Sequence, residues 1–229
     1  TIATIFILTI FLISFQYEKT LTEGSVAKRV RTMNSFISSA ERDTSRALYI
    51  AGYRTILVME NNISRGSYIS NTTLVFQEAI LNGTFEGRNS SILAGSAFSD
   101  WKKTIEQKGS EINVLVNITN INIKIYQESP WSITIEADFN LFVNDSTGLA
   151  YWNKSEIIKS EIGIEGFEDP LYTIKTGGKL PNIINRTIYE GFYVSGTNVS
   201  NLSSHALNSF YTENSLAPSI IMRFEGRAG

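Results

Sequence analysis

The chain begins with an uncharged apolar segment, residues 1–15, in which eleven residues are Ile, Phe, Leu or Ala. As a helix this segment would be roughly 22 Å long, which is shorter than the roughly 30 Å hydrocarbon core of a bilayer. Apolar helices that bundle with one another need no such length, so we expect the segment to form the core of an assembly of copies. The large apolar side chains of this expected polymerisation core are Ile2, Ile5, Phe6, Ile7, Leu8, Ile10, Phe11, Leu12, Ile13 and Phe15.

A long amphipathic segment follows. No Pro occurs before Pro130, so residues 1–60 can form one helix, amphipathic over 16–60 and with Gly24 as the expected site of a kink. Such a helix would reach roughly 85 to 90 Å. Steps of three and four residues place one stripe of apolar and small side chains on a single face: Val26, Val30, Met33, Ile37, Ala40, Thr44, Ala47 and Ala51.

This stripe has two interpretations. In the first, it meets neighbouring copies, and the expected rod contacts are Val26, Val30, Met33 and Ile37. In the second, the part after Met33 packs on the chain's own globular domain. Under both interpretations the helix before Met33 is expected to project from that domain.

The remaining residues, 61–229, form the expected globular domain. Short helices are predicted at 73–81, capped by Thr72 or Thr73, and at 99–108, capped by Ser99 or Asp100. Alternation of apolar and polar residues then predicts strands over 112–125, 132–143 and 149–164, with a bulge near Thr119 and turns at 130–131 and 145–148. Further strands are expected at 183–194 and 219–224, and a loop around Gly177, Gly178 and Pro181 is expected to precede them.

The predicted fold class is therefore α+β, with a long N-terminal α-helix and a globular domain dominated by an antiparallel β-sheet. Composition narrows the function. The net charge of −2 argues against nucleic-acid binding, and the lack of cysteine excludes disulfides and thiolate metal sites.

Ten Asn-x-Ser/Thr triplets form the second informative pattern. Chance predicts about four from the content of Asn, Ser and Thr, and every triplet lies at or after residue 62. Because this triplet is the acceptor for N-linked glycans, we expect the globular domain to be glycosylated and extracellular. The expected N-glycosylation sites are Asn62, Asn71, Asn82, Asn89, Asn117, Asn144, Asn153, Asn185, Asn198 and Asn201.

Catalytic and metal-binding readings have little support. His205 is the single histidine, and we expect it to lie at the surface or to cap a helix. Gly177-Gly178-Lys179 lacks the residues of a phosphate-binding loop, so it is predicted to be a turn. An acidic group could in principle hold calcium but is expected to be a solvated edge: Glu161, Glu165, Glu168 and Asp169. Aromatic candidates for subunit contacts or adhesion are Tyr189, Phe192, Tyr193, Phe210 and Tyr211. No catalytic residue, metal site or cofactor is expected, apart from covalent glycans.

This layout of an apolar front helix, an amphipathic rod and a sequon-rich β domain resembles the type IV pilin superfamily, and it is most similar to archaeal pilins. Bacterial pilins carry an acidic residue near the front of the helix. Here position 5 is Ile5 and the first acidic residue is Glu18, which favours the archaeal branch. The segments 166–172 and 218–226 also look like motifs of archaeal secreted proteins with such anchors.

The resemblance implies a structural subunit, not an enzyme, of an archaeal pilus-like filament at the cell surface. Adhesion is compatible with such a filament. Its partners would be copies of itself, the pilus assembly machinery and the cytoplasmic membrane that holds the precursor, whose upstream leader is expected to be removed by a prepilin peptidase. Neither nucleic acid nor a small-molecule substrate is expected. The alternative is a membrane-tethered extracellular adhesin or sugar-binding ectodomain that does not polymerise; an extracellular hydrolase has almost no support.

Overall fold

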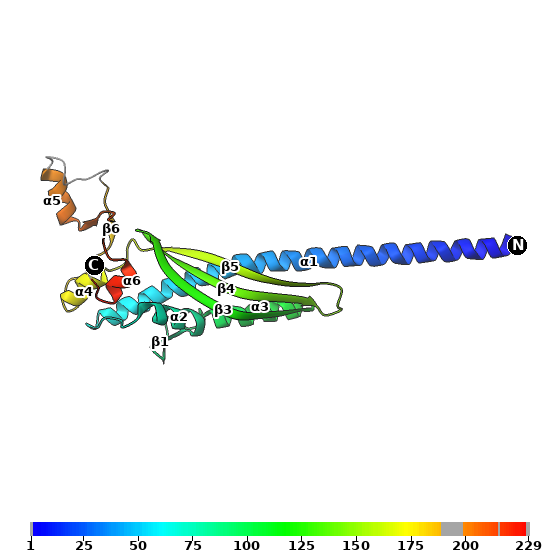
Figure 1. Cartoon of the computed structure of the whole chain (residues 1–229), viewed down its shortest axis with the longest axis horizontal. Coiled ribbons are helices and arrows are strands. Elements are labelled where there is room, and N and C mark those ends of the chain that lie inside the picture. Colours follow the sequence, from blue (N-terminus) through cyan, green and yellow to red (C-terminus); the bar gives the residue numbers. More distant parts are fainter. Residues whose placement is uncertain (1, 189–198, 215, 228–229) are drawn as a thin grey trace.

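The computed structural model describes residues 2–188, 199–214 and 216–227, without the side chains of residues 2–10, 15, 17–23 and 199–201. A single rod-like helix extends from a domain built on an antiparallel sheet, and the N-terminal end of the rod lies farthest from that domain (Figure 1). The elements α4, α5 and α6 gather at the opposite end of the molecule. The α+β class predicted from the sequence is confirmed.

The rod is one helix, α1 (Ile2–Ile63), of 62 residues, which corresponds to about 93 Å. It passes through Gly24 as continuous helix, because no proline interrupts it and nothing packs on that side of the chain. Its rear half belongs to the domain core, with Met33, Ile37 and Leu48 among its buried side chains. For the stripe after Met33, packing on the chain's own domain is thus the interpretation that the fold supports.

Two short helices follow. The helix α2 (Thr72–Asn82) is capped by Asn71, whose Oδ1 accepts from the backbone N–H of Leu74 at 3.0 Å. The helix α3 (Phe98–Glu111) follows Ala97, which makes no side-chain cap. The predicted caps at Thr72, Thr73, Ser99 and Asp100 were therefore wrong, because in each case the helix begins earlier than the apolar pattern does. Between the helices lies a small hairpin of β1 (Thr84–Phe85) and β2 (Arg88–Asn89).

The main sheet is an antiparallel meander in the order β3-β4-β5, formed by β3 (Val114–Ser129), β4 (Ser132–Asp145) and β5 (Tyr151–Gly163). The register of β3 against β4 shifts between Thr119 and Asn122, which confirms the predicted bulge. Asn120 adopts φ 55° there, in the left-handed region that Asn tolerates. Along β4, every second residue from Ile133 to Val143 is buried, on the face of the sheet that packs against α1, α2 and α3. The alternate positions form the outer face of the sheet.

The C-terminal part departs from the predictions. The expected strand over 219–224 is instead the helix α6 (Ile220–Phe224), capped by Ser219, whose Oγ accepts from Met222 N–H at 3.2 Å. A run of five apolar-rich residues has no clear period, and Pro-Ser before it is a helix-start signal. Of the strand expected over 183–194, the short β6 (Asn185–Arg186) is present, and residues 189–194 lie outside the described part.

The remaining elements are α4 (Pro170–Lys175), α5 (Val199–Leu207) and β7 (Phe210–Tyr211), which pairs in parallel with β6. The predicted turn at Gly177 and Gly178 is confirmed, with positive φ at both residues. A Cβ at Gly178 would lie 2.8 Å from the carbonyl oxygen of Ser64, so this turn packs closely on the chain just after α1. The C-terminal elements therefore fold onto the end of the rod helix.

Candidate functional site: the projecting helix and the domain surface

The projecting part of α1 exposes three consecutive large apolar side chains. Phe11, Leu12 and Ile13 are 67%, 54% and 62% exposed. Consecutive helical residues point about 100° apart, so three in a row cover most of the circumference. The other residues of the expected polymerisation core also lie on α1, but their side chains are outside the description. Within the described residues, no helix combines the length and apolar character needed to cross a membrane.

The helix leaves the domain at a set of polar contacts between α1 and the sheet, made by Arg29 with Asp145, Ile112 and Asn113, which we call the polar lock. Arg29 donates from Nε to Asp145 at 2.5 Å and from Nη2 to the carbonyl oxygens of Ile112 (2.8 Å) and Asn113 (2.7 Å). The Asp145 side chain is fully buried. A hydrogen bond from the Thr147 hydroxyl, followed by those from Arg29, lowers the pKa of Asp145 to about 2. An ionised carboxylate at the end of β4 thus holds the rod where it leaves the domain.

This lock divides the four expected rod contacts. Met33 and Ile37 lie on the domain side and are buried in its core, so they cannot serve as exposed contacts on a free rod. Val26 and Val30 lie beside the lock and are half-buried. The exposed part of each side chain is therefore available for contact with a neighbouring subunit.

The sequon asparagines lie mostly on the domain surface. Exposed side chains belong to Asn71, Asn82, Asn89, Asn117, Asn153 and Asn185, and half-buried ones to Asn62 and Asn144. Asn201 is on α5 with its side chain outside the description, and Asn198 lies outside the described residues. Asn71 caps α2 through Oδ1, which leaves Nδ2, the atom that carries an N-linked glycan, free of that bond. The six exposed asparagines are therefore accessible to modification.

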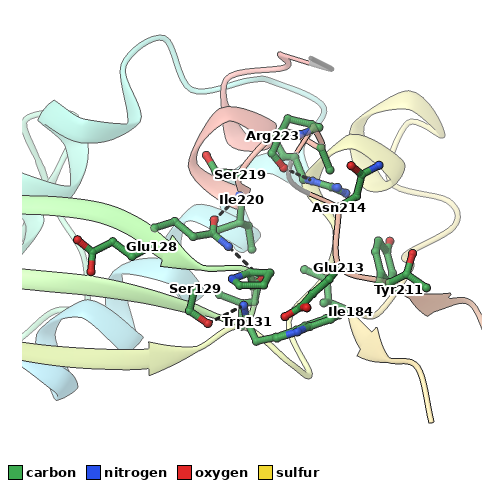
Figure 2. A pocket seen from close by; sticks show the side chains of 16 residues that line it. Glu128, Ser129, Trp131, Ile184, Tyr211, Glu213, Asn214, Ser219, Ile220 and Arg223 are labelled. Atoms are coloured by element: carbon green, nitrogen blue, oxygen red, sulfur yellow. Dashed lines mark hydrogen bonds between the residues drawn. The ribbon is translucent and has the colours of Figure 1, made fainter. Parts of the chain in front are cut away.

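A cleft of about 550 Å³ lies at the end of the domain that is far from the projecting helix (Figure 2). Its walls come from the β3–β4 turn, from Ile184 and Tyr211, and from the chain leading into α6. Trp131 contributes its indole, whose Nε1 has no hydrogen-bond partner among the described residues. The guanidinium of Arg186 sits 5.3 Å from the Trp131 ring centroid. Glu128 and Glu213 are exposed at the cleft and form no ion pair within the described part of the chain.

One wall of the cleft is fixed by a buried carboxylate. Asp169 pairs with Arg223 and accepts from the hydroxyl of Tyr211 at 2.8 Å. Asn182 in turn donates to the Tyr211 oxygen at 2.6 Å. Burial and the neighbouring Asp169 raise the pKa of Tyr211 well above its usual range. The charges of this wall compensate one another, so the cleft as a whole offers aromatic surface and free carboxylate acceptors, the groups that hold a polyhydroxylated ligand.

The structure also places the residues considered for catalysis and metal binding. His205 lies in the last turn of α5, but it is buried and packs edge-on against Phe210 at 5.8 Å, so the expectation of a surface histidine was wrong. Its ring fills a gap between α5 and β7. It does not line the cleft.

The expected solvated acidic edge is wrong in part, because Asp169 is buried and pairs with Arg223. Glu168 accepts from Thr173, and Glu161 lies exposed on β5. No group of three or more potential metal ligands occurs among the described residues. Of the aromatic candidates, Tyr211 serves the network of its own chain, while Tyr189, Phe192 and Tyr193 lie outside the described part.

Sequence reasoning missed a half-buried acid near the C-terminal end of α1. The Glu60 carboxylate accepts from the backbone N–H of Glu168 at 2.5 Å. Burial raises the pKa of Glu60 to about 7, and the adjacent Glu168 carboxylate adds to the increase. Nothing in the local sequence marks Glu60, because its partner lies more than one hundred residues away. By contrast, Asp169-Pro170 is a readable helix start, and Asp169 does cap α4.

Comparison of the chain with protein-family models, with curated proteins and with solved structures found no match.

Proposed function

We propose that this protein is a structural subunit of an extracellular archaeal type IV pilus-like filament. The observation that carries the proposal is the exposure of Phe11, Leu12 and Ile13 around a helix that extends well beyond its domain. The expected polymerisation core offers ten large apolar side chains, whose burial at about 2 kcal/mol each gives roughly 20 kcal/mol before the cost of association. A single chain with this segment in water gains none of this burial free energy.

The geometry of the exposed segment favours a filament over a closed dimer. Because Phe11, Leu12 and Ile13 point about 100° apart, one partner helix cannot cover all three, and several neighbours are needed. Contacts between different surfaces of identical subunits propagate along an axis unless their rotation closes a ring. Before assembly the apolar segment would rest in the cytoplasmic membrane, and the assembly machinery would move it into the filament core. The domain, with its sequons, would form the outer sheath.

The test is the appearance of sheared cell-surface material under the electron microscope. Cells that produce the intact chain should carry filaments, whereas Phe11→Asp should abolish them by placing a charge in the bundle. Leu74→Asp is the matched control, because Leu74 is similarly exposed, at 60%, but lies on the domain. Filaments that persist with Phe11→Asp, or with residues 1–15 deleted, would exclude the bundle.

A membrane-tethered, sugar-binding ectodomain is the second candidate, and the cleft at Trp131 is the observation that favours it. In that case Trp131→Ala should abolish binding of the purified chain on a glycan array, while Leu180→Ala, an exposed apolar residue outside the cleft, should not. Asp at Val26 or Val30 also separates the two candidates. It should weaken a filament and leave a tethered monomer unchanged.

A further inference from the structure

Three sequons meet on one end of the outer face of the sheet. The register pairs Asn117 with Phe142 and Phe142 with Asn153, so one aromatic residue lies between two sequon asparagines. The next row on the same face pairs Leu115, Asn144 and Tyr151. Since neighbouring strands are about 4.8 Å apart, Asn117 and Asn153 lie only about 10 Å from each other.

This end of the face also carries apolar side chains, the exposed Leu115 and Tyr151 and the half-buried Phe142, which we name the 115–142–151 patch. Leu115 is 58% and Tyr151 71% exposed, and the rings of Phe142 and Tyr151 are 6.4 Å apart. The opposite face of the same strands is buried against the helices. Adjacent exposed aromatic and aliphatic side chains on a sheet usually indicate a covering partner.

The other end of the outer face is different. There Glu136 binds Lys124 at 2.9 Å and Lys159 at 3.3 Å and accepts from the Tyr126 hydroxyl at 3.1 Å. The asparagines Asn122 and Asn140, which share this face, open no sequon. The three outer-face sequons thus all lie around the patch, while the other end, where Ile157 is the exposed apolar side chain beside the Glu136 cluster, carries no sequon.

We propose that N-linked glycans on Asn117, Asn144 and Asn153 pack on the 115–142–151 patch and cover it. A pyranose ring has an apolar face of C–H groups that fits an aromatic ring, and its hydroxyls remain in water. Glycans attached on both sides of Phe142 are held above the patch by the strands themselves, so little further ordering is required. The inference rests on the extracellular location in the proposed function.

Thermal unfolding of the full chain, purified in detergent from cells that glycosylate it, tests the proposal. Mass spectrometry should find glycans on Asn117 and Asn153. Asn117→Gln and Asn153→Gln should each lower Tm by about 2–4 °C, the shift for a modest loss in a chain of this length. Asn185→Gln, which removes an exposed sequon far from the patch, should leave Tm unchanged.

A double-mutant cycle separates packing from a general effect of glycans. In a Tyr151→Ser background, Asn153→Gln should lose most of its effect on Tm. In an Ile157→Ser background the effect should remain, because Ile157 is exposed on the same face but lies two rows beyond Asn153.

Empty sites, an unchanged Tm or an effect that survives Tyr151→Ser would overturn the inference. Cross-linking of position 151 between two fully glycosylated copies would overturn it too, by assigning the patch to a subunit contact. Filaments seen by microscopy in any of these cases would show that the proposed function stands without the covering glycans.

Discussion

The close approach of the rod to the sheet at Gly52 yields a prediction with a matched control in the same helix. A Cβ at Gly52 would lie 2.1 Å from Cδ1 of Ile135 and 2.5 Å from Cδ1 of Ile162. Relaxed carbon–carbon contacts are about 3.5–4.0 Å, so the Cδ1 atom of each isoleucine would have to move by about an ångström or more. Both isoleucines are fully buried, and close-packed protein cores contain few voids into which a side chain can move. Gly52→Val should therefore destabilise the domain by about 3 kcal/mol, the upper part of the range for overpacking.

The control is Gly24→Val, because nothing lies within 4 Å of a Cβ at Gly24. Thermal unfolding followed by circular dichroism should show Tm lowered by roughly 6–12 °C for Gly52→Val, at about 2–4 °C per kcal/mol. Gly24→Val should shift Tm by no more than about 2 °C, as expected for an exposed site. Equal Tm values for the two variants would mean that the rear half of α1 does not dock on the sheet in this way.

Two further predictions concern the ends of the docked helix. Because burial raises the pKa of Glu60 from its ordinary 4.5 to about 7, its protonated form stabilises the fold; this contribution is complete below about pH 4.5 and is lost as the pH rises through about 7. In Glu60→Gln the fall of Tm between pH 5 and 7.5 should be flatter than in the unmodified chain, and parallel curves would contradict the assignment. At the other end, Arg29→Ala should speed hydrogen exchange of the amides at 26–32 by about tenfold, since charged hydrogen bonds are lost. Arg31→Ala, at an exposed position on the same helix, should not change the exchange rate. Equal exchange rates in both variants would show that the Arg29 side chain does not hold the helix against the sheet.

The long elements were predictable because each repeats one period over many residues. The absence of proline up to Pro130 and the spacing of the stripe defined α1, and alternation defined the three strands and even the shift near Thr119. The predictions of short elements were wrong because such elements are too short to repeat a period. The apolar run before Phe224 contains no complete helical repeat, so the cap at Ser219 was a better guide than hydrophobicity.

The polar sites were less accessible to sequence reasoning, because their partners are distant in the chain. Arg29 and Asp145 are separated by 116 positions, and Arg223 and Asp169 by 54. A stripe also indicates which face of a helix is apolar without indicating its partner, which is why Met33 fitted both a subunit contact and a core position. A uniformly apolar segment is different, because the prediction that residues 1–15 form an assembly core needs only their composition and no assignment of a helix face.

The central claim is that these first residues lie at the axis of a filament, and the cysteine-free chain allows a direct measurement of their exposure. A single cysteine in Leu12→Cys or, as control, Leu74→Cys can be labelled with a water-soluble maleimide in sheared, washed surface material. The account predicts filaments in which position 12 is protected and position 74 reacts, and equal labelling of both once detergent has dispersed the subunits. Position 12 reacting as fast as position 74 in intact filaments, or only single molecules in lipid or detergent and no filaments, would contradict it.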